Sequence, residues 1–331
     1  MNLAAIFQEA LSLGASDIHL TAQVPPVYRV QGELLKTEHP PLQKEDTESF
    51  FSEITAEYPE VRKSFQECGE VDFAYAPGFA RYRVNAFLQR GTTALAIRVI
   101  KSELPTLEEL GMPEIVKEFA KKKSGLILAA GAAGSGKSTT LAAMVDFINT
   151  ERACHIITLE DPIEYWHHSQ KSIINQRQIK RDSLNFAAAL RASLRQDPDV
   201  ILIGEMRDAE TMAVAITAAE TGHLVLATLH TKSASSSVAR IIDAFPPHQR
   251  GAAQSQLAYV LEGVIAQELV FDKKSQQRKA AAEILVATSA VKNLIREGKI
   301  HQIDSLIQTG AQFGMQTKEH ALKKLHRQEE R

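Results

Sequence analysis

Residues 125–148 read GLILAAGAAGSGKSTTLAAMVDFI, and this stretch decides the fold of the longer part of the chain. The apolar run Leu126–Ala130 predicts a buried strand, and Thr139–Ile148 predicts a helix. Between them, Gly131–Ser138 matches the pattern GxxxxGK[ST] in full. A strand before this pattern and a helix after it are the context that a phosphate-binding loop requires. We therefore predict a P-loop at residues 131–138.

The residues of this loop predict how it would bind ATP and Mg²⁺. Its glycines allow a tight turn whose N–H groups face the phosphates, and the following helix adds its positive end. Lys137 is expected to reach the β- and γ-phosphates, and the Ser138 hydroxyl to ligate Mg²⁺. The expected nucleotide-binding residues are Gly131, Gly134, Ser135, Gly136, Lys137, Ser138 and Thr139.

Hydrolysis also needs carboxylates, and two later stretches supply them. Residues 158–165 (TLEDPIEY) and 197–208 (DPDVILIGEMRD) carry acidic side chains at the ends of predicted strands. Ligands of open α/β sheets bind at the carboxyl ends of the strands. We assign Glu205 to the metal and Glu164 to the attacking water. Two other carboxylates lie nearer the strand end and could exchange roles with Glu164, namely Glu160 and Asp161.

A third stretch, residues 221–231 (TGHLVLATLHT), predicts a strand that leaves His230 at its carboxyl end. A histidine at this place could sense the γ-phosphate. A lone histidine is more often an ordinary polar residue than a catalyst. The assignment of His230 therefore depends on the motifs around it.

The pattern of the chain predicts an α/β fold with two domains. From residue 124 on, apolar runs alternate with helical stretches, which indicates a mainly parallel sheet flanked by helices. We assign residues 1–100 to an N-terminal domain, residues 101–113 to a linker and residues 114–331 to the second domain, which ends in helices. The charged end Lys323–Arg331 is expected to fray.

In the first domain, apolar alternation predicts strands at Asp17–Leu20 and Val27–Leu34 and a hairpin of Arg81–Gln89 with Thr93–Ile100. Its period of two places Arg81 and Arg83 on one face of the hairpin. The opposite face is expected to join the core with Tyr82, Val84, Ala86 and Leu88.

Composition narrows the possible partners and location. The chain has 331 residues, 38 of them basic and 40 acidic, so it shows no global electrostatic footprint for nucleic acid. Cys68 and Cys154 lack the spacing of a zinc site or of a disulfide framework. The N-terminus has no signal-peptide pattern, and no apolar run reaches the roughly 18 residues of a membrane span. We expect no nucleic-acid partner, no direct membrane insertion and a cytoplasmic location.

Four boxes in order resemble the Walker A, Asp box, Walker B and His box of the secretion and type IV pilus ATPases. They are GAAGSGKST, TLEDPIEYW, DPDVILIGEMRD and TGHLVLATLHT. The resemblance implies a PAS-like N-terminal domain, a RecA-like ATPase domain and a homo-hexameric ring with ATP between protomers. It also implies that Glu164 activates water, that Glu205 supports Mg²⁺ and that arginines of the first domain reach the nucleotide. Arg83 and Arg98 are the matching candidates.

Within this superfamily the chain is most similar to the PilT-type retraction ATPases of type IV pili. It is short, it lacks the four-cysteine zinc module of extension ATPases, and residues 290–297 (AVKNLIRE) resemble the retraction motif AIRNLIRE. The resemblance implies a platform protein of the inner membrane as partner and a peripheral association with that membrane through it. Departures at Ala132, Ala133 and Gln196 leave open an auxiliary retraction paralogue that works beside a related pilus ATPase. A ring component that binds ATP without hydrolysing it is a further alternative.

Overall fold

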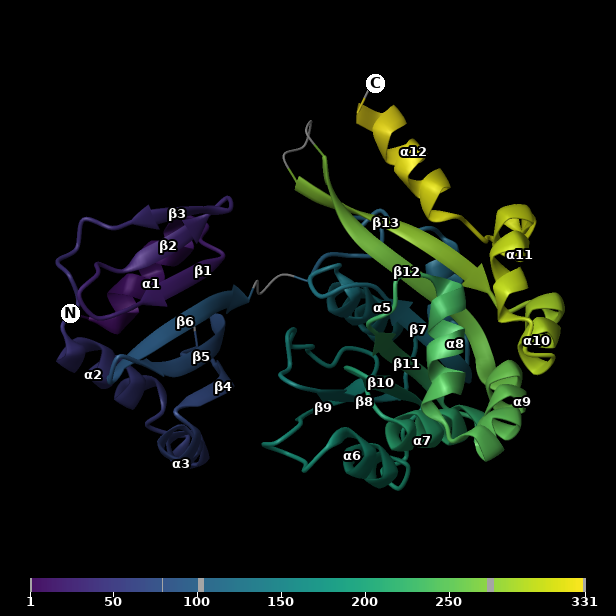
Figure 1. Ribbon diagram of the computed structural model, residues 1–331, viewed down its shortest axis with the longest axis horizontal. Coiled ribbons are helices and arrows are strands. Elements are labelled where there is room, and N and C mark those ends of the chain that lie inside the picture. Colours follow the sequence, from purple (N-terminus) through teal and green to yellow (C-terminus); the bar gives the residue numbers. More distant parts are fainter. Residues whose placement is uncertain (1, 79, 101–103, 273–276, 330–331) are drawn as a thin grey trace. The chain divides into compact units, whose positions relative to one another are not determined.

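Two separate β-sheets organise the chain, one in each of two units (Figure 1). The computed structural model describes residues 2–78, 80–100, 104–272 and 277–329. The units span Met1–Glu103 and Leu104–Arg331.

The first unit is an antiparallel sheet with three helices packed against it. Its strand order is β3-β2-β1-β6-β5-β4. The core contains fully buried aromatic side chains, among which Phe7 and Tyr82 stack with ring centroids 4.3 Å apart. Segregation of helices and antiparallel strands makes this an α+β N-terminal domain. Its elements are α1 (Leu3–Ser12), β1 (Asp17–Leu20), β2 (Val27–Val30), β3 (Glu33–Lys36), α2 (Lys44–Ile54), α3 (Pro59–Cys68), β4 (Glu70–Tyr75), β5 (Arg81–Gln89) and β6 (Thr92–Ile100).

Two details of this sheet correct the sequence-based expectation. The single strand expected at Val27–Leu34 is two strands, because Gln31 and Gly32 have φ values of 52° and 95° and turn the chain between β2 and β3. Leu88, expected in the core, is 53% exposed because it lies at the hairpin end of β5, next to the turn.

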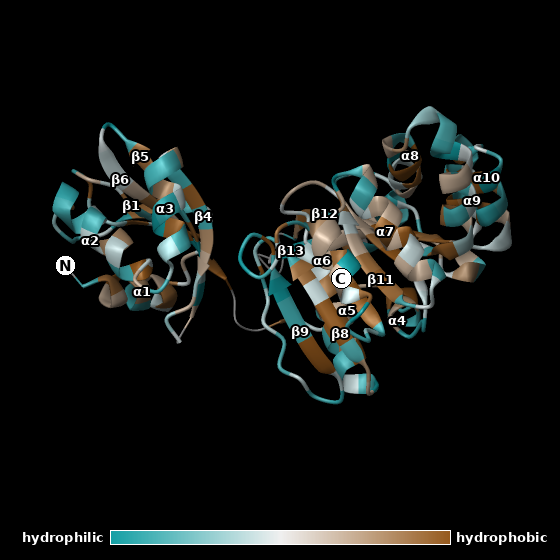
Figure 2. Ribbon diagram, turned by 90° about the horizontal axis from the view of Figure 1, so that it is seen from below, coloured by the Kyte–Doolittle hydropathy of each residue, from teal (hydrophilic) through white to brown (hydrophobic). Residues whose placement is uncertain are grey.

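The second unit is built on a mainly parallel sheet, as predicted, and its strand order is β13-β12-β7-β11-β10-β8-β9. Only the edge strand β13 is antiparallel to its neighbour. Every residue of β7 and β11 is buried, because helices cover both faces of a parallel sheet. Figure 2 shows the brown, hydrophobic colour along these inner strands. The strands are β7 (Gly125–Ala130), β8 (His155–Glu160), β9 (Ile173–Gln178), β10 (Val200–Ile203), β11 (Leu224–Leu229), β12 (Leu261–Asp272) and β13 (Gln277–Val286).

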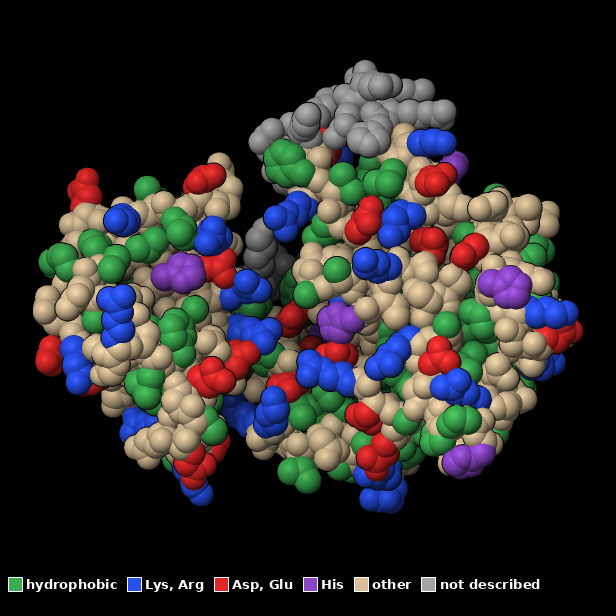
Figure 3. Space-filling model, viewed as in Figure 1, with side chains coloured by type: hydrophobic (Ala, Val, Ile, Leu, Met, Phe, Trp, Pro, Cys, Tyr) green, Lys and Arg blue, Asp and Glu red, His purple; other side chains and the backbone are tan. Residues whose placement is uncertain are grey.

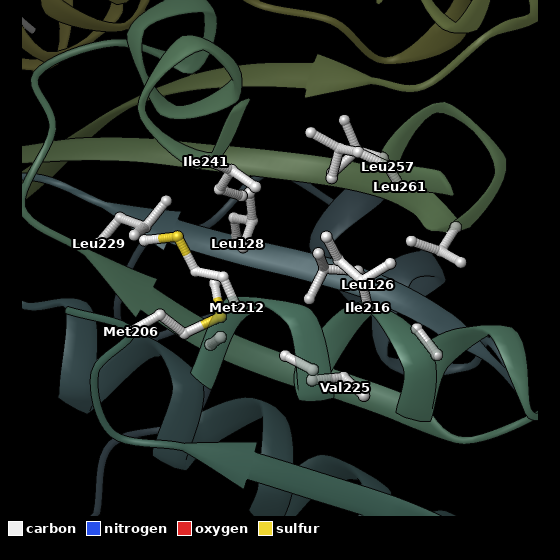
Figure 4. Packing of buried hydrophobic residues seen from close by; sticks show 14 of the residues in the cluster. Leu126, Leu128, Met206, Met212, Ile216, Val225, Leu229, Ile241, Leu257 and Leu261 are labelled. Carbon is white, nitrogen blue, oxygen red and sulfur yellow. The ribbon is translucent and has the colours of Figure 1, made fainter. Parts of the chain in front are cut away.

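Two helical layers enclose this sheet. One core cluster joins it to α4 and α5, and another joins it to α6, α7, α8 and α9. Figure 4 shows the second cluster, in which Leu128 of β7 and Ile241 of α8 point toward one another. The helices are α4 (Ile115–Ala120), α5 (Lys137–Glu151), α6 (Phe186–Ser193), α7 (Ala209–Glu220), α8 (Ala234–Ala244), η1 (Pro247–Gln249), α9 (Arg250–Val260), α10 (Ser289–Arg296), η2 (Ile300–Gln302), α11 (Ile303–Thr309), η3 (Ala311–Phe313) and α12 (Lys318–Glu329).

The structure differs from the sequence-based expectation at the linker and at the C-terminal end. Residues 101–103 lie outside the described residues, and the chain groups with the second unit from Leu104 on. Leu107 is 2% exposed and packs in the core with Val116 and Phe119, so its burial fixes this segment to the second unit. The charged end belongs to α12, which packs against β13 and is helical to Glu329.

The surface of the second unit is mixed in charge on the face that Figure 3 shows, where basic and acidic side chains are interspersed. Within the described ranges, no helix has both the length and the apolarity needed to cross a bilayer.

Candidate functional site

One edge of the second sheet carries the P-loop, both acidic stretches and His230. The strands β7, β11, β10 and β8 are consecutive parallel neighbours, so their carboxyl ends lie side by side. Backbone hydrogen bonds join the loops that follow them: the Gly131 N–H donates to the Leu229 carbonyl, and the Met206 N–H to the Thr228 carbonyl. The residues directly after these strands are Gly131, Asp161, Gly204 and His230.

Glycine is required at two positions of the P-loop. Gly136 has φ 87° and caps the N-terminus of α5 in the left-handed region. Gly131 has φ 146°, and a Cβ there would lie 2.4 Å from the Gln267 carbonyl oxygen and 2.4 Å from Ser135 Oγ. A side chain at either position would strain the loop, which keeps the backbone free to approach a phosphate.

Lys137 is held inside this loop. Its Nζ donates to the carbonyls of Gly131 at 2.9 Å and Ala132 at 2.8 Å, and the side chain is 7% exposed. Burial lowers the pKa of Lys137, while the charges of Glu205 and Glu164 act in the opposite direction. Two carboxylates from separate loops therefore act on the ammonium group that is expected to bind phosphate.

The strand β12 contacts the P-loop through the side chain of Gln267. Gln267 Nε2 donates to the Ser135 carbonyl at 2.8 Å, and this glutamine is 3% exposed. In the described part of the chain, Ser135 Oγ and Gln267 Oε1 are buried without a hydrogen-bond partner. Buried polar atoms without partners are rare in native proteins, so these two atoms fit a loop that offers polar groups to a phosphate ligand.

Glu205 contacts two cationic or ionisable side chains. Its Oε2 lies 2.7 Å from Arg207 Nε, and its Oε1 lies 3.1 Å from His230 Nε2. Glu205 is 18% exposed, whereas Arg207 is 75% exposed. The structure thus joins the Walker B and His box stretches through one carboxylate, an arrangement that the sequence did not predict.

The structure separates the environments of Glu160 and Glu164. Glu160 Oε1 accepts hydrogen bonds from Thr158 Oγ1 at 2.6 Å and Gln176 Nε2 at 3.3 Å, and burial raises its pKa. Glu164 is half-buried, and its charge acts on Lys137. Two neighbours thus bind the Glu160 carboxylate, and the assignment of the attacking water to Glu164 stays a prediction.

A direct contact connects the Asp box to the P-loop helix. Tyr165 Oη lies 3.0 Å from Thr139 Oγ1, in the first turn of α5. Because Tyr165 follows Glu164 directly, this contact ties the acidic loop to the helix that begins with Lys137 and Ser138.

A cavity of about 590 Å³ adjoins the P-loop within the second unit. It is lined by P-loop and helix residues such as Gly136 and Thr139, by Leu269 of β12 and by Arg278 and Lys279 of β13. The cavity combines apolar, polar, basic and acidic lining, the last from Glu108 and Glu109.

Comparison with known proteins identifies the family. The profile described as type II/IV secretion system protein matches residues 1–330. The chain belongs to this family. It is 46% identical to the type IV pilus retraction ATPase PilT of Pseudomonas aeruginosa over 326 residues, which cover 98% of this chain and 94% of that protein. It is also 42% identical to the type IV pilus ATPase PilU of the same organism, with 96% and 83% covered.

A solved structure has the same fold over both units. The crystal structure of the pilus retraction motor PilT with bound ADP matches with a TM-score of 0.92 and 45% identity, covering 99% of this chain and 94% of that one. The α+β and RecA-like architecture expected from the four boxes is thereby confirmed.

Arg83 and Arg98 lie together in the first unit. They face each other across β5 and β6, where Arg83 pairs with Asp72 and Arg98 Nε lies 3.0 Å from Asp17 Oδ1. Both arginines are therefore available on one sheet face, each with an acidic partner. Their action on a nucleotide stays a prediction.

The donor set fits Mg²⁺ better than a softer metal. No group of three or more histidine, cysteine, aspartate or glutamate side chains that could hold a metal occurs among the described residues. Mg²⁺ is usually bound by one or two protein oxygen ligands together with substrate phosphates and water. The Ser138 hydroxyl and the Glu205 carboxylate are oxygen ligands of this kind.

Four residues of the site were missed by sequence reasoning: Gln176, Arg207, Tyr165 and Gln267. A signal existed for Gln267, which is a polar residue inside the apolar run Val264–Val270. No sequence signal pointed to Gln176, because its place near the site depends on which strand β9 joins in the sheet.

Proposed function

We propose that this protein is a Mg²⁺-dependent ATPase that drives retraction of type IV pili. One observation carries the enzymatic part: the P-loop with its buried Lys137 and the two acidic stretches follow neighbouring parallel strands of one sheet, so they share one sheet edge. The retraction part rests on the similarity to PilT along 98% of the chain.

The proposed reaction converts ATP and water to ADP and phosphate. The water oxygen attacks the γ-phosphorus, the bond to the bridging β-oxygen breaks, and Glu164 accepts a proton from the water. Lys137 and the N–H groups of the P-loop neutralise the charge of the phosphates. Ser138 and Glu205 would hold Mg²⁺, which would supply further neutralisation of the phosphate charge when bound.

His230 and Arg207 would respond to the state of the nucleotide in this scheme. Both contact Glu205, so a change in the position of that carboxylate must change at least one of these contacts. His230 is 48% exposed and can therefore turn toward a γ-phosphate without leaving a buried site.

The working assembly in this proposal is a homo-hexamer. Arg83 and Arg98 of one protomer would complete the site of a neighbour, and the ring would act on a platform protein of the inner membrane from the cytoplasmic side. A paralogous pilus ATPase is a further partner of the machine in this proposal.

A second candidate is the auxiliary motor of such a machine, because the chain is also 42% identical to PilU. Deletion of the gene distinguishes the two. Excess pili without twitching motility are expected for the main retraction motor, whereas an auxiliary motor should leave partial retraction. Bald cells would contradict retraction, and a purified protein without ATPase activity would contradict the enzymatic proposal.

A further inference from the structure

Gln176 binds the Asp-box segment at three points. It lies on β9, the edge strand that pairs in parallel with β8. Its Nε2 donates to the Tyr165 carbonyl at 2.8 Å and to Glu160 Oε1 at 3.3 Å, and its Oε1 accepts the His167 N–H at 2.8 Å. One side chain thus connects residues on both sides of Glu164.

These contacts determine the orientation of the Gln176 amide. The nitrogen side faces two oxygen acceptors and the oxygen side faces a backbone donor, so the opposite orientation would lose all three hydrogen bonds. A carboxamide is the side-chain group that offers a donor and an acceptor together in this geometry. A carboxylate of the same shape could keep only the bond from His167.

The segment that Gln176 binds also contacts the P-loop helix, because Tyr165 Oη lies 3.0 Å from Thr139 Oγ1. Glu164 is therefore fixed from both directions, by β9 through Gln176 and by α5 through Tyr165. A group that activates water must be within hydrogen-bond reach of it, so the path of this segment sets whether Glu164 can act.

We propose that Gln176 is a positioning residue for Glu164: it holds residues 160–167 so that the Glu164 carboxylate faces the γ-phosphate site. The inference rests on the proposed ATPase function. It assigns Gln176 no contact with the nucleotide.

The prediction is a selective loss of turnover. A displacement of a reacting group by about 1 Å can cost on the order of 10²-fold in rate. Gln176→Glu should lower kcat by about 10- to 100-fold, because the introduced carboxylate opposes the Tyr165 carbonyl and the Glu160 carboxylate. Affinity for a non-hydrolysable ATP analogue should change by less than about twofold, since the P-loop contacts are unchanged. Gln176→Met, which removes all three bonds at similar volume, should act in the same direction.

The protein contains a reporter for the segment itself. Trp166 is the single tryptophan of the chain and lies between Tyr165 and His167. Its emission should shift in Gln176→Glu and Gln176→Met at temperatures below the Tm of each variant. Gln170→Glu is the matched control, because it introduces the same charge at an exposed position between β8 and β9. This control should keep the wild-type kcat and emission.

The outcomes separate this inference from the proposed function. An inactive wild-type protein would refute the ATPase proposal, while the Trp166 emission would still test the positioning role. An active wild type with unchanged kcat and emission in both Gln176 variants would overturn the inference. Loss of analogue affinity in proportion to kcat would also overturn it, since the effect would then extend to the P-loop.

Discussion

His230 Nε2 lies 3.1 Å from Glu205 Oε1, so the side chain that ends β11 contacts the carboxylate that follows β10. The same two strands are joined by the hydrogen bond from the Met206 N–H to the Thr228 carbonyl at 3.2 Å. A change in the charge or position of Glu205 must therefore alter its contact with His230. The candidate metal ligand and the candidate phosphate sensor form one unit.

His230→Ala should lower kcat at least about tenfold with little change in Tm, because the side chain is half exposed and removal of one group that stabilises transition-state charge costs about 10²–10³-fold. His223→Ala is the matched control. His223 precedes the opposite end of β11, where its Nδ1 lies 2.9 Å from the Ala218 carbonyl oxygen. ATPase rates near the wild-type value in His230→Ala would exclude His230 from the reaction.

Glu164→Gln should keep ATP affinity and lose turnover by about 10²-fold or more, because the amide cannot accept the proton of the attacking water. Glu160→Gln should retain most activity, since an amide oxygen can still accept the hydrogen bonds from Thr158 and Gln176. Single-turnover kinetics with equilibrium binding of ATP measure both. The reverse pattern would assign the water to Glu160. Lys137→Ala should instead weaken ATP binding itself.

Arg98→Ala should slow turnover at least about tenfold if this arginine completes the site of a neighbouring protomer. Arg98 is 65% exposed in its ion pair with Asp17, and pairs at the surface contribute about 0–1 kcal/mol, so stability should hardly change in Arg98→Ala. Asp17→Ala breaks the same pair and is the control. Activity per protomer should rise with protein concentration as the ring assembles. Full activity in a strictly monomeric fraction would refute the shared site. The variants Arg83→Ala and Asp72→Ala allow the same comparison of an arginine with its acidic partner.

The segment Ala290–Glu297 forms most of α10, and only some of its side chains are exposed. Val291 and Ile295 are fully buried, whereas Leu294 is only partly buried. Lys292 Nζ lies 3.0 Å from Glu262 Oε1 and is 23% exposed, so this lysine anchors the helix to the start of β12.

Ile295→Ala should lower the free energy of unfolding by about 2–5 kcal/mol, because it removes a buried side chain. Arg296→Ala should leave Tm and ATPase activity unchanged, since Arg296 is exposed. If the segment transmits ring motion, Arg296→Ala should still abolish twitching in cells. Normal twitching in that variant, with normal ATPase activity, would show that this charge does not transmit ring motion.

His167 should make the protein less stable as the pH falls. Burial lowers the pKa of His167 from 6.5 to about 4. Between these values the unfolded chain binds a proton that the folded protein does not, so stability falls as the pH drops from about 6.5 to about 4, by at most about 3 kcal/mol. Denaturant unfolding at several pH values measures this. His167→Gln should flatten the curve in that window, and the exposed His301→Gln should not. Parallel curves for wild type and His167→Gln would contradict the assignment.

The sequence by itself determined the elements whose signal is local. Short-range sterics and phosphate chemistry fix the strand Leu126–Ala130, the glycines of the P-loop and the helix after them. The structure has this strand, loop and helix in the predicted order. The order of apolar runs after residue 124 was enough to predict a parallel sheet, because strands buried on both faces read as continuous apolar stretches.

Tertiary structure alone decided which loops meet and which neighbours each carboxylate has. Glu160 and Glu164 are four residues apart with the same chemistry, and the fold brings Thr158 and Gln176 within hydrogen-bond distance of Glu160. The strand neighbours of β9 and β12, which bring Gln176 and Gln267 to the site, follow from pairing between segments far apart in the chain. Such pairing is set by the packing of the whole sheet, which no local pattern of residues encodes.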